Sequence, residues 1–194
     1  MNQNSLPPGI VRDTRHRHRI FVLDALKHFH FGSADIIKMS KVKHLGELGE
    51  IALRHIDRIG PFCTGIGPMT TGEPARSVDQ NFEIFRAVYL RILKGDLPGP
   101  KSIFYQLLFE FDIKRISDES YDRKNDLNTF YEDLFKYFYG PIMNHDYLQA
   151  VWRMPDWSGS VGARIEHDLL SRREKVPTFY DAIDHVDEVQ DLLV

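Results

Sequence analysis

PDWSGSVGARIEH, residues 155–167, joins a short apolar run to an amphipathic one. The preceding run, residues 147–154, predicts a buried strand, and the segment that continues through Leu169 and Leu170 predicts a helix. The Gly/Ser turn between them places a carboxylate, Glu166, one turn into that helix. Ligands of open α/β sheets bind at such junctions, outside the carboxyl ends of the strands. The free N–H groups at the helix start suit an oxyanion or a phosphate, and we expect Glu166 to point into the same crevice.

The same alternation of strands and helices extends over most of the chain. Short apolar runs predict strands over 59–66, 102–108, 147–154 and 177–180. Apolar residues at gaps of three and four predict helices over 77–94, 127–138 and 160–173. Gly140-Pro141 is expected to stop the second of these helices, which a polar stretch, 114–125, precedes. This pattern predicts an α/β domain over residues 57–194, with a parallel sheet covered by helices on both faces.

Residues 1–56 are expected to form a partly helical N-terminal extension of this domain. Residues 19–31 predict a short helix or a strand, and residues 33–56 predict one or two helices. Gly46 and Gly49 disfavour a regular helix in the second stretch.

Composition limits the classes of protein to which the chain can belong. It has 194 residues, a formal net charge of −3 and one cysteine, Cys63, so an intrachain disulfide is excluded. No apolar segment follows the basic residues at the start, and no run approaches the roughly 18 apolar residues of a membrane span. We therefore expect a cytoplasmic protein with neither nucleic acid nor membrane as a partner. The basic segment 12–30 and the acidic segment 181–191 are interpreted as solvated ends.

Residues 67–76 form a second candidate ligand loop after the first expected strand. Thr70, Thr71 and Gly72 offer hydroxyl and N–H groups, and Arg76 offers a planar fork for an anion. The loop matches neither the P-loop nor the dinucleotide fingerprint. The structural alternative is a Gly-rich turn before a helix cap. The corresponding alternative for residues 155–167 is that Ser160 caps the helix and that Glu166 is an exposed carboxylate.

Four segments taken together carry a resemblance to a known family. They are GPMTTG…N…F from residue 67, FYQLLFE at 104–110, FYGPI at 138–142 and PDWSGSVGARIEH…VP from residue 155. In this order they resemble the nucleoside 2-deoxyribosyltransferase-like superfamily, over about residues 59–182, and the WSGSxGARxE part is the most specific. The resemblance implies a flavodoxin-like (Rossmann-like) parallel sheet, an enzyme that cleaves the bond between a base and C1′ of a ribose or deoxyribose, no metal or other cofactor, and a homo-oligomer.

The resemblance also implies roles for individual residues. Glu166 matches the catalytic nucleophile. Ser160 matches a position that holds Asp in nucleoside transferases and a phosphate-binding Ser in some monophosphate glycosidases. Asp126 is the best match to a second carboxylate, with Glu132 and Asp133 as alternatives. The expected substrate-binding residues are Gly67, Met69, Thr70, Thr71, Gly72, Arg76, Trp157, Ser160 and Gly162.

The sequence therefore predicts cleavage or transfer at the N-glycosidic bond of a nucleoside 5′-monophosphate or a nucleoside. A carboxylate can capture C1′ from an oxocarbenium-like transition state, as in retaining glycosidases. Hydrolase and transferase share this first half-reaction, so both remain open. The alternatives from other classes are a nucleotide-binding or sensing module without turnover, and an interaction protein built on the extension.

Overall fold

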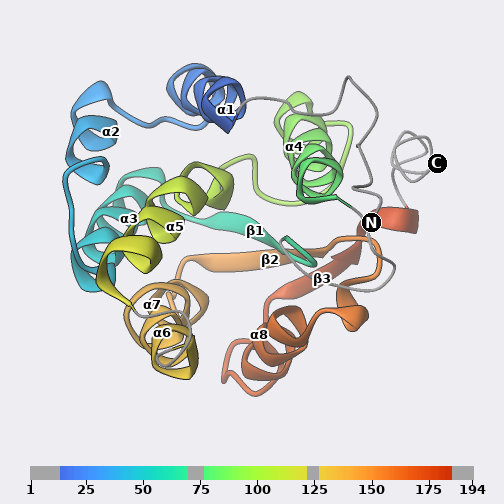
Figure 1. Cartoon of the computed structure of the whole chain (residues 1–194). Coiled ribbons are helices and arrows are strands. Elements are labelled where there is room, and N and C mark those ends of the chain that lie inside the picture. Colours follow the sequence, from blue (N-terminus) through green and yellow to red (C-terminus); the bar gives the residue numbers. More distant parts are fainter. Residues whose placement is uncertain (1–13, 70–76, 122–126, 185–194) are drawn as a thin grey trace, which may run out of the picture.

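The computed structural model describes residues 14–69, 77–121 and 127–184, and its centre is a small parallel sheet (Figure 1). The three strands lie in the order β1-β2-β3. Their bounds are Phe62–Ile66 for β1, Leu148–Arg153 for β2 and Thr178–Asp181 for β3. β1 is buried along its whole length, as expected of a strand covered on both faces. The α/β class and the strands expected near 59–66, 147–154 and 177–180 are thus confirmed.

A fourth segment joins the free edge of β1 at one point. Ile103 forms a parallel bridge to Cys63, after which the chain turns into the 3-10 helix η1, Gln106–Leu108. The strand expected over 102–108 is therefore wrong beyond this bridge. The reason is that Gln106 is turned inward, where its side chain bonds to β1 and stops the backbone from continuing the ladder. Since the chain visits Ile103 on one side of β1 before it forms β2 on the other, the connection order reverses at β1.

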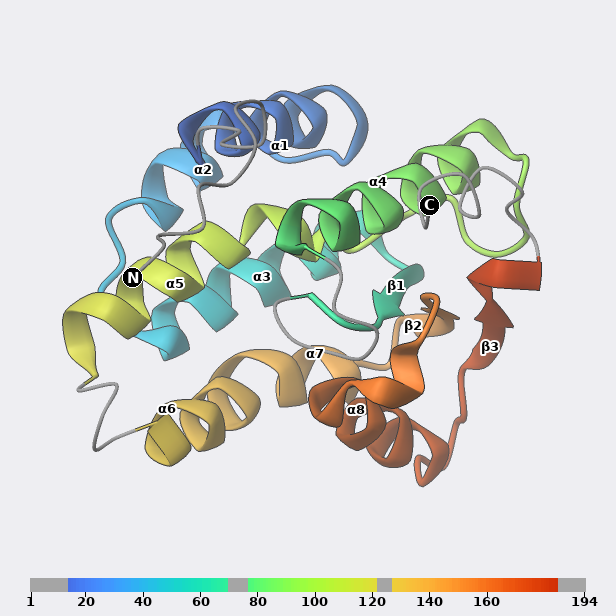
Figure 2. The same cartoon turned by 45° about the vertical axis from the view of Figure 1, so that its right-hand side comes forward.

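Helices cover both faces of the sheet. Figure 1 shows α1 and α4 above the strands and α6, α7 and α8 below them, and Figure 2 shows the same layers after rotation. The α-helices are α1 Thr14–His28, α2 Ser33–Met39, α3 Leu45–Ile59, α4 Val78–Lys94, α5 Glu110–Ser120, α6 Leu127–Leu134, α7 Gly140–Met143 and α8 Val161–Ser171. Shorter turns are η2 Phe135–Tyr139, η3 Trp157–Gly159 and η4 Ala182–Asp184.

Local signals explain α4 well. The Ser77 side chain accepts from the Gln80 N–H and the Gln80 side chain accepts from the Ser77 N–H, which is a capping box. Gly95 ends the helix in the left-handed conformation. These observations confirm the helix expected over 77–94. Of the one or two helices expected within 33–56, the structure has two, α2 and most of α3, and α3 includes both Gly46 and Gly49.

In the middle of the chain the structure differs from the sequence analysis in two ways, of which the first is a helix that was not predicted. Residues 114–120 belong to helix α5, whose buried face includes the polar side chains Asp112 and Ser117 beside Ile113 and Ile116. Polar residues on the inner face concealed the helical pattern. Asp112 is tolerated there because Arg115 donates to its carboxylate at 2.9 Å.

The second difference is that Gly140-Pro141 does not stop a helix, contrary to the expectation. The chain passes from α6 through the π-helical turn η2 into α7. The Gly140 N–H donates to the Phe135 carbonyl, five residues back, and a Cβ at Gly140 would lie 2.5 Å from that oxygen. Pro141 follows in the first turn of α7 and has no N–H, so the helical path continues there with one backbone hydrogen bond fewer.

The N-terminal helices contribute to the same core as the sheet. Phe29, just after α1, stacks on Tyr105 with ring centroids 3.9 Å apart, and Phe31 stacks on His55 of α3 at 3.7 Å. Residues 19–28 are helical, which resolves the choice between helix and strand there. Cys63 is buried in β1, and burial raises the pKa of its thiol to about 12, as expected of an inert core cysteine.

Candidate functional site

A cavity of about 590 Å³ opens where β1 and β2 end. Its walls come from the segment after β1, from η1 and the start of α5, from α6 and η2, and from the first turns of α8. The described lining residues are Gly67, Met69, Gln106, Glu110, Tyr131, Glu132, Leu134, Phe135, Tyr139, Ser160, Val161, Gly162, Ala163, Ile165 and Glu166. This is the position at which parallel sheets bind ligands, outside the strand ends where the connection order reverses.

The start of α8 forms one wall of this cavity. Ser160 is the N-cap, is 7% exposed, and accepts from the Ala163 N–H at 3.4 Å. The N–H groups of Val161 and Gly162 belong to the first helical turn and have no intrahelical acceptor. Ser160 therefore caps the helix and lines the cavity at the same time, because its hydroxyl proton remains available to a ligand.

Glu166 lies one turn further along α8 and also lines the cavity, as the sequence predicted. The residue is half-buried. Burial, followed by the negative charge of Glu110, raises the pKa of the Glu166 carboxyl to about 8. The interpretation of Glu166 as an exposed helical carboxylate is thus wrong.

Glu110, the first residue of α5, is a second carboxyl group in this cavity, and it was not among the expected site residues. The Tyr139 hydroxyl donates to Glu110 Oε1 at 2.7 Å. Burial raises the pKa of Glu110 to about 7, and the hydrogen bond from Tyr139 opposes that rise. Burial and the neighbouring charges of Glu110 and Glu166 raise the pKa of Tyr139, so Tyr139 stays a donor at neutral pH.

Two carboxyl groups whose pKa values are both raised retain at least one proton between them near neutral pH. The cavity therefore offers a proton donor and a proton acceptor together. Such a pair is what acid–base or covalent chemistry at a polar bond requires.

A buried hydrogen-bond network holds the walls in place. Thr64 Oγ1 and the Tyr89 hydroxyl donate to Gln106 Oε1 at 2.6 and 2.9 Å. Gln106 Nε2 donates to the Gly65 carbonyl at 3.1 Å, and the Gly65 N–H donates to the Tyr89 oxygen at 2.9 Å. These bonds join β1, α4 and η1, so the exit of β1 and the backbone leading to Glu110 are fixed relative to each other.

Close backbone approach also shapes the exit of β1. A Cβ atom at Gly67 would lie 2.6 Å from Met154 Cβ, which follows β2. Only glycine allows the chain leaving β1 to pass this close to the chain leaving β2. The two segments therefore meet at the cavity.

The structure brings together five of the expected site residues, namely Gly67, Met69, Ser160, Gly162 and Glu166. Trp157 does not join them. Its ring packs on His167, with centroids 4.6 Å apart, and under the guanidinium of Arg153. The expected ligands Thr70, Thr71, Gly72 and Arg76, and the expected carboxylate Asp126, lie outside the described residues.

The two alternatives to Asp126 separate in the structure. Glu132 lines the cavity, whereas the Asp133 carboxylate accepts from the Tyr121 hydroxyl at 2.9 Å.

Among the described lining residues are three glutamates and no lysine, arginine or histidine. Arg164 turns away, since its guanidinium donates to the Ser158 carbonyl at 2.5 Å.

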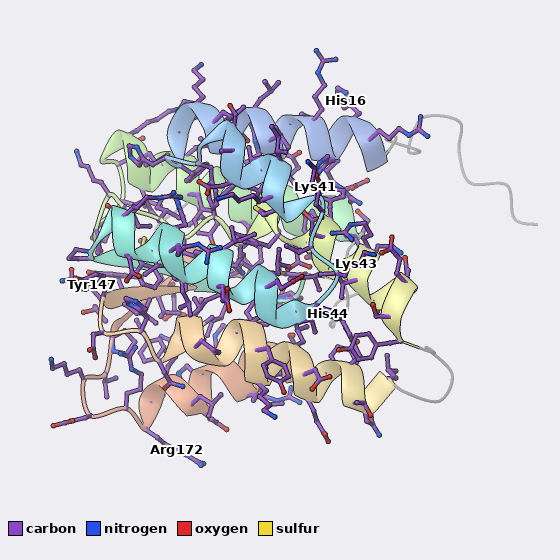
Figure 3. All side chains as sticks on the ribbon, turned by 90° about the vertical axis from the view of Figure 1, so that its left-hand side faces the viewer. His16, Lys41, Lys43, His44, Tyr147 and Arg172 are labelled. Carbon is purple, nitrogen blue, oxygen red and sulfur yellow. The ribbon has the colours of Figure 1, made fainter. Side chains whose placement is uncertain are left out.

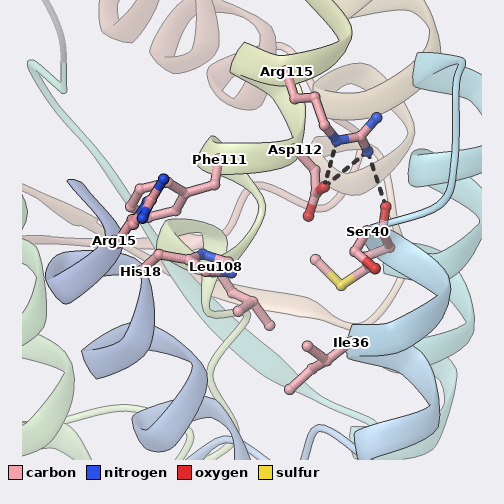
Figure 4. A pocket seen from close by; sticks show the side chains of 9 residues that line it. Arg15, His18, Ile36, Ser40, Leu108, Phe111, Asp112 and Arg115 are labelled. Atoms are coloured by element: carbon pink, nitrogen blue, oxygen red, sulfur yellow. Dashed lines mark hydrogen bonds and ion pairs between the residues drawn. The ribbon is translucent and has the colours of Figure 1, made fainter.

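Figure 4 shows a different cavity, of about 320 Å³, between α1, α2 and α5. Arg115 donates there to Asp112 and to the Met39 carbonyl, so its guanidinium holds α5 against α2. His18 packs edge-on against Phe111, with ring centroids 4.6 Å apart. These contacts hold the walls of this cavity together.

Basic side chains on and between the first three helices differ in the direction in which they point. Arg17 turns inward and pairs with Asp79 of α4. His16 on α1, and Lys41, Lys43 and His44 between α2 and α3, project outward (Figure 3). Among the described residues, no group of three His, Cys, Asp or Glu side chains is arranged to hold a metal ion.

The chain was compared with protein-family models, with curated proteins and with solved structures, and none of them matches it. Over the described residues, no helix combines the length and the apolar character needed to cross a bilayer.

Proposed function

We propose that the protein cleaves, or transfers a sugar at, the N-glycosidic bond of a nucleoside or nucleoside 5′-monophosphate, with Glu166 as the nucleophile. The observation that carries this proposal is the pairing of Glu166 with Glu110 in one cavity, at the carboxyl ends of β1 and β2. The spatial order Ile103, β1, β2, β3 supports it, because a flavodoxin-like sheet has this order over its first four positions. The sequence resemblance supports the same fold and the same nucleophile.

The proposed reaction uses the two carboxyl groups of the cavity. As the C1′–N bond breaks, its electron pair leaves with the base, and a carboxylate oxygen of Glu166 bonds to C1′. A protonated carboxyl group supplies the proton that the departing base needs. Water or a second base then attacks C1′ and frees Glu166. Water gives a hydrolase and a second base gives a transferase.

The first turn of α8 is the proposed site of the 5′ group. The N–H groups of Val161 and Gly162 and the hydroxyl of Ser160 are donors beside Glu166. A 5′-phosphate would bind these donors, whereas Arg76, the counter-charge expected from the sequence, lies outside the described residues. We expect Ser160→Asp to weaken binding of a monophosphate by repulsion and to spare a nucleoside. If Ser160→Asp affects both alike, Ser160 does not bind the 5′ group.

The proposal is tested by incubating the protein with a panel of nucleosides and their monophosphates and measuring free base by chromatography. Wild-type protein should release base from at least one member, and Glu166→Gln should release none. Glu174→Gln is the matched control, because Glu174 is exposed, is close in sequence and does not line the cavity. Turnover by a folded Glu166→Gln variant would exclude the mechanism.

One observation favours a second candidate, a nucleotide-binding module without turnover. A pKa of about 8 keeps most of the Glu166 carboxyl protonated at neutral pH in the empty cavity, and a protonated carboxyl is a poor nucleophile. A binding module would show a ligand-dependent rise in melting temperature without base release. In that case Glu166→Gln, which mimics the neutral carboxyl, would keep ligand affinity.

A further inference from the structure

A second cavity, of about 340 Å³, adjoins the one that holds Glu166. It lies between α1, α4, α5 and α6. Glu110, Tyr131 and Leu134 line both cavities, so these side chains form the wall that the two cavities share. Glu166 lines only the first cavity, and Glu110 therefore stands between Glu166 and the second space.

The second cavity is suited to a flat aromatic group. Phe82, Phe111 and Phe130 form much of its wall. Arg17 of α1 places its guanidinium over the rings of Phe82 and Phe111, at 5.0 and 5.6 Å from their centroids. Aromatic walls with a few polar groups are typical of sites for planar heterocycles. The N-terminal extension thus supplies part of this wall, although the family resemblance does not cover it.

We propose that the second cavity receives the base of the substrate and that Glu110 is the acid that protonates it as it leaves. This inference rests on the proposed function. The order of groups along the two cavities matches the order within a nucleoside. The α8 N-terminus faces the 5′ group, Glu166 faces C1′, Glu110 stands at the glycosidic bond, and the aromatic wall faces the base. Glu110 takes the role that the sequence resemblance assigned to Asp126.

The proposed step is balanced in atoms and charge. In the empty cavity Glu166, which has the higher pKa, holds the proton that the pair shares, so in the substrate complex this proton must pass to Glu110 and leave Glu166 ionised. The C1′–N bond then breaks, its electron pair goes to the base nitrogen, and the Glu110 proton passes to the base. Glu166 meanwhile forms an ester bond to C1′. The new carboxylate of Glu110 is held by the Tyr139 hydroxyl, 2.7 Å from Oε1. In hydrolysis, water then bonds to C1′, its proton passes to Glu110, and Glu166 leaves as a carboxylate.

The test uses a purine nucleotide and its N7-methylated counterpart. The methylated base is already cationic and leaves as a neutral molecule, so it needs no proton. We expect wild-type protein to cleave both substrates. Glu110→Gln should lose about 10²- to 10⁴-fold in rate on the ordinary nucleotide and stay within a few fold of wild type on the methylated one. Glu166→Gln should lose both activities, and Glu174→Gln should keep both.

These results test the role of Glu110 separately from the proposed function. If Glu110→Gln, shown to be folded by circular dichroism, slows both substrates equally or neither, Glu110 is not the acid, and the proposed function stands on Glu166 alone. If wild-type protein releases base from no member of the panel of nucleosides and monophosphates, the proposed function fails and this inference fails with it.

The base subsite has its own variant. Ser117 lines the second cavity and is 5% exposed, so Ser117→Met fills that space. Leu127 also lines this cavity and is 46% exposed, so Leu127→Trp should narrow the cavity without disturbing the core. Both variants should weaken nucleotide binding by about tenfold or more and leave the affinity for ribose 5-phosphate, which lacks a base, unchanged. Equal loss for both ligands, or for neither, would place the base elsewhere.

Discussion

Replacing Glu166 with glutamine should stabilise the fold, and the gain should grow with pH. The carboxyl of Glu166 has a pKa of about 8 in the folded protein and an ordinary value of 4.5 when it is exposed. The unfolded chain therefore loses this proton at a lower pH than the folded protein does. Folding stability linked to a raised carboxyl pKa is complete below the unfolded value and falls as pH rises toward the folded value.

The size of the effect follows from that difference. Each pH unit between 4.5 and about 8 costs the folded state about 1.4 kcal/mol, so the upper limit at pH 7.5 is about 4 kcal/mol. Glu166 is only half-buried, and its titration is coupled to that of Glu110. Solvent screening and this coupling reduce the expected value to about 1–2 kcal/mol. Glutamine has nearly the same shape but no charge, and so avoids this cost.

The assay is urea denaturation at several pH values between 4 and 8. The difference in unfolding free energy between Glu166→Gln and wild type should be small at pH 4 and should rise by about 1–2 kcal/mol by pH 8. Glu174→Gln, which removes an exposed carboxylate, is the control and should show no such rise. A difference that stays constant from pH 4 to pH 8 would mean that Glu166 ionises as in water, and the account of a desolvated carboxyl pair would be refuted.

Three further predictions test other parts of the structure. Gly49→Ala should lower the free energy of unfolding in urea by about 1–3 kcal/mol, because its Cβ would lie 2.1 Å from the Tyr137 carbonyl oxygen. Gly46→Ala in the same helix is the control: its Cβ meets nothing within 4 Å, so it should be neutral or stabilising by up to about 1 kcal/mol. Neither ring nitrogen of the buried His55 has a hydrogen-bond partner among the described residues, and burial lowers the pKa of this imidazole to about 4. The wild-type protein should therefore lose stability as pH falls from about 6.5 toward 4, and His55→Leu should not show this loss. We also expect a homo-oligomer, because α8 carries an exposed apolar stripe that includes Leu169. Light scattering should give a mass above that of the monomer, and Leu169→Glu should lower this mass. A monomeric wild-type protein would contradict the prediction.

The sequence by itself determined the elements whose signals are local. A short apolar run bounded by turn residues is enough to indicate β1, β2 and β3. Ser77, Gln80 and Gly95 mark the ends of α4 through bonds and dihedral angles within a few residues of the chain. The turn at 155–167 likewise places Glu166 at the carboxyl end of β2, because strand, turn and helix are consecutive.

The tertiary structure alone decided which groups meet Glu166. Glu110 and Tyr139 are 29 residues apart, and their hydrogen bond exists because α5 and η2 pack around one cavity. Both residues lie in quoted motifs, FYQLLFE and FYGPI. However, the first motif lies mostly in a segment that resembled a strand, and the second contains the Gly-Pro pair that resembled a stop. In the structure, Gln106 turns inward and ends the strand, and a π-turn before Gly140 lets the helix continue. Both features depend on contacts with other elements, which the local sequence does not show.

The same holds for the electrostatics of the cavity. Desolvation and a neighbouring like charge raise the pKa values of the two glutamates, and both effects require the assembled walls. In an extended chain the carboxyl groups of Glu110 and Glu166 would ionise independently at ordinary values. Packing places both carboxyl groups in one partly desolvated cavity, where the ionisation of one raises the pKa of the other.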